Sequence, residues 1–134
     1  MKSVAVIEKG KEGKYGIYVA DDDLPFGVIG DGETVADAMA DFNNSVEEMR
    51  TYYQDIGKEF PKDLEFDFRY DRASFLQQYA YAFTLAGLER ITGVRQRQLS
   101  YYIKGIRIPS DKTVRKIEDG LHAFGNEIIS VKFS

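Results

Sequence analysis

Residues 85–105, LAGLERITGVRQRQLSYYIKG, decide how the second half of this 134-residue chain folds. Apolar positions recur at helical spacing on both sides of Gly93, which predicts one helix over 85–92 and another over 95–104. Two helices that cross at a steep angle need a tight turn, and glycine adopts the backbone conformation that such a turn requires. The side chains expected to pack between the two helices are Leu88, Val94, Leu99 and Tyr102.

Two more helices are expected around this pair. The pattern after residue 72 is helical and predicts a helix over 73–83. Gly105 is expected to end the helix over 95–104, and Ser110, directly after Pro109, is a suitable cap for a fourth helix. The apolar positions of that fourth helix are Val114, Ile117, Leu121 and Phe124.

The last residues show a different period. Ile129, Val131 and Phe133 alternate with Ser130 and Lys132, which predicts a short C-terminal strand. A lone strand leaves its N–H and C=O groups unpaired, so it needs a partner. The partner is either the sheet of the N-terminal half or the same strand of a second copy. We favour the second copy, which makes these three apolar residues the expected dimerisation residues of a homodimer or higher homo-oligomer.

The helical half resembles the helix-turn-helix domains of phage repressors over about residues 73–125. Gly93, Ser100, Gly105 and the pair Pro109–Ser110 all fall in register with that family. Two positions depart from it. Glu89 stands where the family usually has a small residue, and Arg95 replaces the usual Ser or Thr cap, which weakens the cap but adds a positive charge. The alternative for this half is a four-helix bundle without a DNA role.

The resemblance implies that the helix over 95–104 enters the major groove of DNA. Arginine can pair with guanine O6 and N7, and glutamine with adenine N6 and N7. The residues expected to contact bases are Gln96, Arg97, Gln98 and Tyr101. Contacts to phosphate, which position a domain without selecting a sequence, are expected from Arg95, Lys104, Arg107, Lys112 and Arg115.

The distribution of charge agrees with a nucleic-acid partner for this half. The chain has 18 Lys+Arg against 22 Asp+Glu, a net charge of -4. Residues 1–83 carry 9 basic against 17 acidic side chains, whereas residues 84–134 carry 9 against 5. Such asymmetry indicates that the basic half meets a polyanion and the acidic half does not.

The N-terminal half is predicted to fold as β-β-β-α-β. Runs of β-branched and aromatic residues predict strands over 4–8, 15–19 and 27–30, and alternation predicts another over 64–70. Thr34 can cap a long helix with an apolar stripe and an acidic exposed face, which Gly57 is expected to end. The whole chain is therefore expected to be α+β, with a module over 1–71 and an all-α helix-turn-helix domain with a C-terminal strand over 72–134.

This order of modules resembles the HicB-type antitoxins. The matching residues are the strand Val4–Glu8, the loop Asp23-Leu24-Pro25 and the segment Gly30–Thr34 followed by Ala38. Phe26 follows Pro25 where that family commonly has glycine, and Gly32-Glu33 lengthens the helix entry by one residue. The resemblance implies a partial ribonuclease-H-like fold for residues 1–71.

The resemblance also implies a function. Such antitoxins bind and silence a small, basic, mRNA-cleaving toxin of the HicA type, and they repress their own promoter. An acidic surface is complementary to a basic partner. The residues implied as toxin-binding are Asp21, Asp22, Asp23, Leu24, Phe26 and Glu47. Two alternatives remain open: an orphan helix-turn-helix regulator whose N-terminal module senses a small ligand, and a remnant of a metal-dependent nuclease.

The sequence offers little for catalysis or for a cofactor. It contains no cysteine, which excludes disulfides and thiolate metal sites, and its single histidine, His122, has no histidine or cysteine companion. Asp21, Asp22 and Asp23 are adjacent in one loop, and with Asp31 and Asp37 they do not form a spaced carboxylate set on the strands. We therefore expect no enzyme activity, no metal and no cofactor. No signal peptide and no membrane span is predicted, so the expected location is the cytoplasm.

Overall fold

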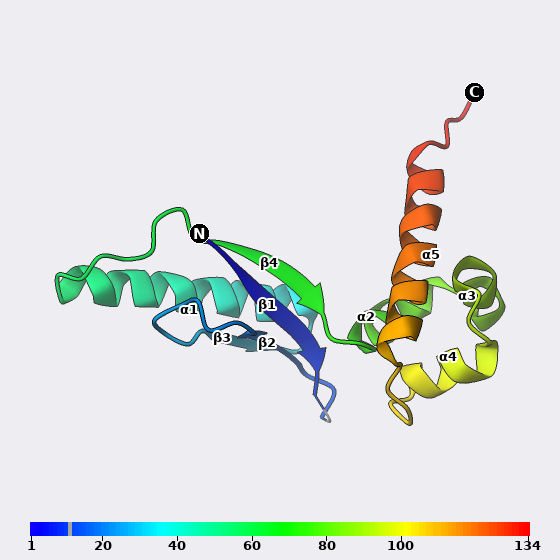
Figure 1. The fold of residues 1–134 in the computed structure, drawn as a ribbon, viewed down its shortest axis with the longest axis horizontal. Helices are drawn as coiled ribbons and strands as arrows, with labels where there is room; N and C mark the ends of the chain where they lie inside the picture. Colours follow the sequence, from blue (N-terminus) through cyan, green and yellow to red (C-terminus); the bar gives the residue numbers. More distant parts are fainter. Residues whose placement is uncertain (11) are drawn as a thin grey trace. The chain divides into compact units, whose positions relative to one another are not determined.

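The computed structural model describes residues 1–10 and 12–134, and the chain divides into two compact units, Met1–Asp71 (unit 1) and Arg72–Ser134 (unit 2) (Figure 1). Unit 1 contains the strands and one long helix, and unit 2 is helical. The α+β class predicted from the sequence is therefore confirmed. The order of elements in unit 1 is β-β-β-α-β, as predicted.

The sheet of unit 1 has four strands in the order β3-β2-β1-β4. β1 pairs with β2 and β2 with β3 in antiparallel register, whereas β4, which follows the helix, pairs parallel to β1. Ala5 therefore lies between Val19 on one side and Phe68 on the other. The strands are β1 (Lys2–Lys9), β2 (Tyr15–Val19), β3 (Ile29–Gly32) and β4 (Glu65–Tyr70).

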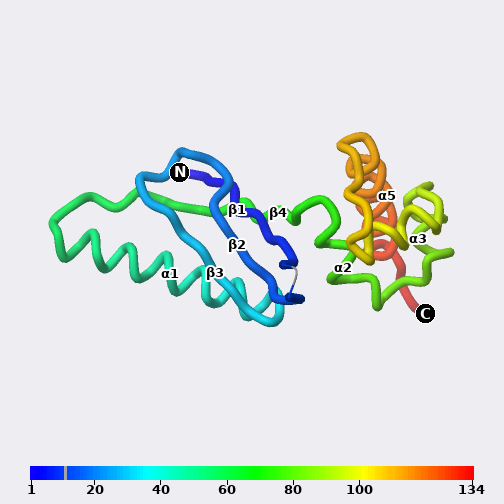
Figure 2. Tube along the Cα trace, turned by 90° about the horizontal axis from the view of Figure 1, so that it is seen from below, coloured from blue at the N-terminus to red at the C-terminus, as the bar shows by residue number. Residues whose placement is uncertain are grey.

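Helix α1 (Val35–Asp55) lies along one face of this sheet (Figure 2). The Thr34 hydroxyl accepts a hydrogen bond from the backbone N–H of Asp37 at 3.1 Å, which confirms the expected cap. Apolar side chains of the helix, the strands and the residue directly before β3 form the core of unit 1: Ala5, Ile7, Tyr15, Ile17, Val28, Ala38, Phe42 and Val46. β3 approaches α1 so closely that a Cβ atom on Gly30 would lie 2.5 Å from the backbone nitrogen of Phe42.

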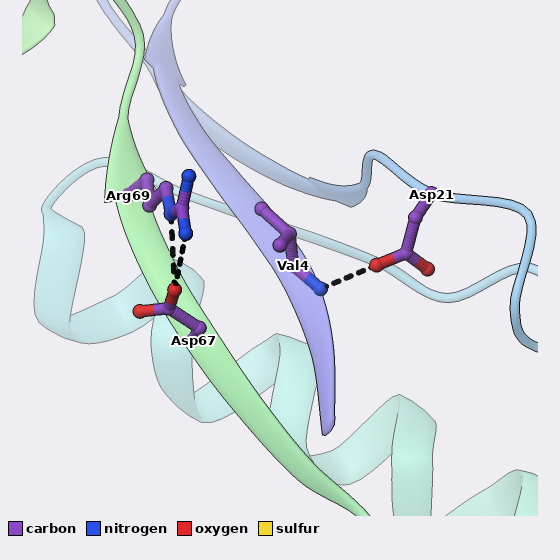
Figure 3. Close-up of polar contacts among 4 residues, drawn as sticks. All are labelled: Val4, Asp21, Asp67 and Arg69. Atoms are coloured by element: carbon purple, nitrogen blue, oxygen red, sulfur yellow. Dashed lines mark hydrogen bonds and ion pairs between the residues drawn. The ribbon is translucent and has the colours of Figure 1, made fainter. Parts of the chain in front are cut away.

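The opposite face of the sheet carries the alternate side chains. The strand register places Ile29, Tyr18, Val6 and Arg69 in one row across all four strands. Ile29 is 65% exposed and Tyr18 38% exposed. We call this row, with Val4 and Asp67 beside it, the open face, because within the described part of unit 1 no helix covers it. Asp67 accepts two hydrogen bonds from Arg69 there (Figure 3).

Unit 2 is built around a second apolar core. Leu76, Leu88, Val94, Leu99, Tyr102 and Ile117 are buried in it. The four side chains predicted to pack between the two central helices all belong to this core. The elements are α2 (Ser74–Tyr79), the short 3₁₀ helix η1 (Ala80–Ala82), α3 (Leu85–Thr92), α4 (Gln96–Ile103) and α5 (Asp111–Ile129).

The single helix predicted over 73–83 is interrupted. α2 ends at Tyr79, η1 follows, and Phe83 is fully extended with φ -135° and ψ 149°. The extended backbone continues through Thr84, whose hydroxyl caps α3 by accepting a hydrogen bond from Gly87 N–H at 2.9 Å. Because an N-cap residue needs a non-helical backbone, the first helix has to end before α3 begins.

The predicted C-terminal strand is wrong. α5 continues to Ile129, and Val131 N–H bonds back to the carbonyl of Ile128 at 3.1 Å instead of entering a sheet. The spacing of Ile117, Leu121, Phe124 and Ile128 keeps one helical period through this region. Ser130 N–H also donates to the carbonyl of Asn126, so the backbone up to residue 131 follows the helical pattern of hydrogen bonds and not that of a strand. The three residues expected to dimerise through that strand, Ile129, Val131 and Phe133, are exposed.

Within the described residues, no helix is both long enough and apolar enough to cross a membrane.

Candidate nucleic-acid interface

The turn between α3 and α4 is held by its own backbone and by one buried hydroxyl. Gly93 adopts the left-handed conformation with φ 73°, and its N–H donates to the carbonyl of Glu89 at 2.7 Å. The buried Thr92 hydroxyl donates to the Leu88 carbonyl at 2.7 Å and accepts from Val94 N–H at 3.1 Å. These bonds satisfy the polar groups of the turn and fix the direction in which α4 leaves it.

The N-terminus of α4 is capped by a residue of the preceding helix. Arg95 occupies the cap position with an extended backbone, but its side chain makes no capping hydrogen bond. Glu89 accepts the backbone N–H of Gln96 at 3.3 Å through Oε1, and the side-chain amide of Gln96 at 3.4 Å through Oε2. The carboxylate also carries the sign of charge that a helix N-terminus favours. The sequence identified Glu89 and Arg95 as unusual, but it did not indicate that Glu89 provides the cap that Arg95 lacks.

The exposed side of α4 contains the residues expected to contact bases. Leu99 and Tyr102 face the core, whereas Gln96, Arg97 and Gln98 are exposed and Tyr101 is half-buried. Gln96 is held by Glu89, as described above. The structure also joins two of these residues directly, because Arg97 Nε donates to the Tyr101 hydroxyl at 2.9 Å.

The loop after α4 brings a further basic residue to the same place. Gly105 has φ 75°, and the backbone turns so that Ile106 N–H donates to the Tyr101 carbonyl at 2.9 Å. The guanidinium of Arg107 then lies over the Tyr101 ring, 5.3 Å from its centroid. Arg72, which the sequence analysis did not single out, holds the far end of this loop. It donates to the Pro109 carbonyl at 3.0 Å and pairs with Asp111.

The remaining residues expected to contact phosphate are all exposed: Arg95, Lys104, Lys112 and Arg115. Arg95 and Lys104 flank α4 at its two ends, and Lys112 and Arg115 lie in the first turns of α5. Unit 2 has 10 Lys+Arg against 5 Asp+Glu, whereas unit 1 has 8 against 17. Seven of the ten basic side chains of unit 2 lie on α4, at its two ends, in the loop after it or in the first turns of α5.

In unit 1, the first residue implied as toxin-binding already has internal partners. The carboxylate of Asp21 accepts a hydrogen bond from the Ser3 hydroxyl at 2.6 Å. It also accepts one from the backbone N–H of Val4 at 2.7 Å (Figure 3). The hydrogen bond from Ser3 is the main cause that lowers the pKa of Asp21, and the bond from Val4 adds to it. Asp21 therefore ties the loop after β2 to β1.

The other residues implied for that role differ in how free they are. Asp22 and Asp23 are exposed and Leu24 is half-buried. Phe26 stacks on Phe60 with ring centroids 5.4 Å apart, so it packs within unit 1. Glu47 is exposed on α1 and pairs with Arg50 at 3.3 Å. Phe26 also meets the ring of Tyr53 on α1, with centroids 5.5 Å apart, so the loop after β2 packs against that helix.

Within the described residues, no group of three or more His, Asp or Glu side chains is placed to hold a metal ion. His122 is exposed on α5.

Comparison with known proteins identifies the helical part. A family model described as helix-turn-helix matches residues 82–122, a stretch that runs from η1 to the middle of α5. No HicB family model matches residues 1–71. No curated protein and no solved structure matches the chain. The left-handed turn at Gly93, the packed pair of α3 and α4 and the family match agree: residues 82–122 are a helix-turn-helix domain, the kind of domain with which transcription regulators bind DNA.

Proposed function

We propose that this protein is the antitoxin of a type II toxin-antitoxin system. In this proposal it binds and inhibits a HicA-like, mRNA-cleaving toxin through unit 1 and represses its own operon by sequence-specific DNA binding through unit 2. The observation that carries the DNA-binding part is the exposed face of α4, where Gln96, Arg97 and Gln98 project from a helix-turn-helix domain with a basic excess. These residue types form hydrogen bonds with the edges of guanine and adenine.

DNA binding by this domain divides into two kinds of contact. α4 enters the major groove with its N-terminal residues at base edges, and the residues at the helix ends and in the following loop contact phosphates. Arg95 lies at the N-terminal end of α4, Arg107 in the loop and Lys112 at the start of α5, so they suit the second role. Base contacts give sequence preference, and phosphate contacts give affinity that decreases as salt increases.

The acidic character of unit 1 supports a basic protein as its partner. With 8 basic against 17 acidic side chains, unit 1 has a net charge of -9. A protein that cleaves RNA has to approach a polyanion and is therefore commonly basic, so the two charges are complementary. Asp22 and Asp23 are the exposed acidic residues of the loop after β2 and can meet such a partner. The open face, with the exposed Ile29 and Tyr18, offers apolar surface within the same unit.

The DNA part is tested by a mobility-shift titration of the full chain on the promoter region of its operon. Arg97→Ala is expected to weaken specific binding by about 1–3 kcal/mol and to leave nonspecific binding nearly unchanged. Lys112→Ala is expected to weaken binding to all sequences alike. If Arg97→Ala left operator affinity unchanged, the assignment of the exposed face of α4 to the major groove would be wrong.

The antitoxin part is tested by co-expression with a candidate toxin, a small basic protein encoded by an adjacent gene. The full chain is expected to relieve the growth arrest caused by that toxin and to form a stable complex with it. Charge reversal at Asp22 and Asp23 is expected to slow association most at low salt, where charges are least screened. An operator-binding chain that has no such partner, and whose operator affinity changes with a small ligand, would instead be an orphan ligand-sensing regulator.

A further inference from the structure

Tyr101 contacts two arginines that come from different segments of unit 2. Arg97 lies one helical turn before it on α4, donates Nε to the tyrosine hydroxyl at 2.9 Å, and has its guanidinium 5.7 Å from the ring centroid. Arg107 comes from the loop after α4 and has its guanidinium 5.3 Å from the same centroid. Both distances fall within the range at which a cation is attracted to an aromatic ring.

These two arginines differ from others in the protein in the way their charge is balanced. Arg50, Arg69 and Arg72 each pair with a carboxylate, from Glu47, Asp67 and Asp111 respectively. Among the described residues, neither Arg97 nor Arg107 forms an ion pair, which is also true of Arg90, Arg95 and Arg115, but only Arg97 and Arg107 lie beside the same aromatic ring. Two cations held near one neutral ring leave a local positive charge that an anionic ligand from outside the chain can balance.

The hydrogen bond from Arg97 also limits how its guanidinium can bind a base. Arginine can bind two acceptors side-on, through Nε and one Nη, or end-on, through Nη1 and Nη2. Nε is already donated to Tyr101, whereas the two Nη atoms have no hydrogen-bond partner among the described residues. Guanine presents O6 and N7 as adjacent acceptors in the major groove, which a pair of Nη donors matches.

We propose that Tyr101 is a positioning residue that makes Arg97 select guanine end-on, through Nη1 and Nη2, and that holds Arg107 toward a neighbouring phosphate. The proposal rests on the DNA binding proposed above and names the base that the site prefers. Arginine side chains lose considerable rotamer freedom when they bind, and a side chain that is already held loses less. The tyrosine hydroxyl is therefore expected to increase discrimination between bases, and the ring to support Arg107.

The experiment uses the full chain and a library of duplexes with a randomised central region. The wild-type protein selects its preferred duplex, and each guanine of that duplex is then replaced in turn by 7-deazaguanine, which lacks N7. For the wild type, replacement at one position per half-site is expected to weaken binding by roughly 2–10-fold, because 7-deazaguanine removes N7 but keeps O6 and so costs one of the two hydrogen bonds. Tyr101→Phe keeps the ring and removes the hydroxyl, and is expected to bring the ratio of the affinities for the guanine and 7-deazaguanine duplexes closer to one.

Three comparisons make the result specific. Tyr81→Phe changes a tyrosine that is 83% exposed on η1 and is expected to bind like the wild type. Arg97→Ala is expected to abolish the 7-deazaguanine effect at the same position. In the Arg97→Ala background, adding Tyr101→Phe is expected to change the binding of neither duplex further. Tyr101→Leu removes the ring that contacts Arg107 and is expected to reduce affinity for all duplexes more than Tyr101→Phe does.

The outcomes separate this proposal from the one on which it rests. If the wild type enriches no duplex from the library, sequence-specific DNA binding itself is wrong, and this inference fails with it. If the wild type selects a duplex but no 7-deazaguanine weakens binding, guanine is not the base that Arg97 contacts. If Tyr101→Phe discriminates as well as the wild type, Tyr101 does not position Arg97. Circular dichroism of each variant is expected to match that of the wild type.

Discussion

Glu89 Oε1 lies 3.3 Å from the backbone nitrogen of Gln96, so a carboxylate from α3 caps the N-terminus of α4. In the helix-turn-helix pattern both Glu89 and Arg95 are unusual. Glu89 is larger than the usual residue at its position, and Arg95 cannot cap α4, so each alone would weaken the turn. Together they are compatible, because Glu89 provides the acceptor that Arg95 lacks. Arg95 is thereby left exposed at the end of the helix proposed to enter the groove.

The first prediction tests this replacement of one cap by another. Glu89→Ala is expected to destabilise unit 2 by about 0.5–2 kcal/mol, the usual cost of losing a helix cap. Adding Arg95→Ser to that variant is expected to recover most of the loss, because serine at the cap position supplies its own acceptor. Urea denaturation followed by circular dichroism measures both, and Glu118→Ala, an exposed position on α5, serves as the control. A double variant no more stable than Glu89→Ala would contradict the compensation.

The second prediction concerns two glycines on α5. A Cβ atom at Gly120 would lie 2.4 Å from the backbone oxygen of Ile91 on α3, whereas one at Gly125 would meet nothing within 4 Å. Gly120→Ala is therefore expected to destabilise unit 2 by about 1–3 kcal/mol, the cost of overpacking. Gly125→Ala is expected to stabilise it by about 0.5–1 kcal/mol, since alanine favours a helix interior. The shift in the urea midpoint of each variant gives both values, and equal shifts would show that α3 and α5 can move apart freely.

The third prediction concerns pH and Asp21. Hydrogen bonds from Ser3 and Val4 lower the pKa of Asp21 in the folded state, so its carboxylate stabilises unit 1. That contribution is present above the ordinary aspartate pKa of about 3.9 and is lost as pH falls from there through the lower folded pKa. Asp21→Asn is expected to destabilise unit 1 at pH 6 and to make its stability less dependent on pH below about 4.

The control for this experiment is Asp22→Asn, because Asp22 is exposed and adjacent to Asp21. Urea denaturation from pH 2.5 to 6 is expected to give the control variant the pH dependence of the wild type. If Asp21→Asn showed the same acid dependence as Asp22→Asn, the internal hydrogen bonds of Asp21 would not govern the acid stability of unit 1.

The fourth prediction concerns oligomerisation, which the proposed repressor needs if it binds two half-sites one helical turn apart. Ile129 is 83% exposed and Phe133 is 96% exposed, and apolar side chains at such exposure favour burial against another surface. Deleting residues 128–134 is expected to yield monomers with weakened operator binding and intact toxin binding. Sedimentation velocity gives the mass directly, and a dimer that persists after the deletion would place the interface elsewhere, for instance on the open face.

The period of apolar residues predicted most of the elements, because it reports on local structure. Thr34, Gly57, Gly93 and Ser110 marked helix boundaries for the same reason, since capping and left-handed turns depend on the residue at one position. The C-terminal strand failed because alternation over five residues fits two periods at once, and the helix that begins at Asp111 continues through Ile129.

Contacts between segments could not be predicted from spacing. Nothing in the sequence indicates that Arg107 lies over the ring of Tyr101, because the loop geometry after Gly105 decides it. The hydrogen bonds that Asp21 accepts from Ser3 and Val4 could not be predicted either. The sequence shows three adjacent aspartates and gives no sign of which one faces β1.

The parallel pairing of β1 with β4 has a consequence for how the protein is made. β2 follows β1 closely and can pair with it early, but residues 65–70 leave the ribosome long after residues 2–9. Until then the outer edge of β1, an apolar strand, presents unpaired N–H and C=O groups to other nascent chains. A product cut short before residue 65 therefore exposes a central strand, and we expect such fragments to be removed by proteases or to aggregate. The cellular supply of unit 1 thus depends on uninterrupted synthesis through residue 70.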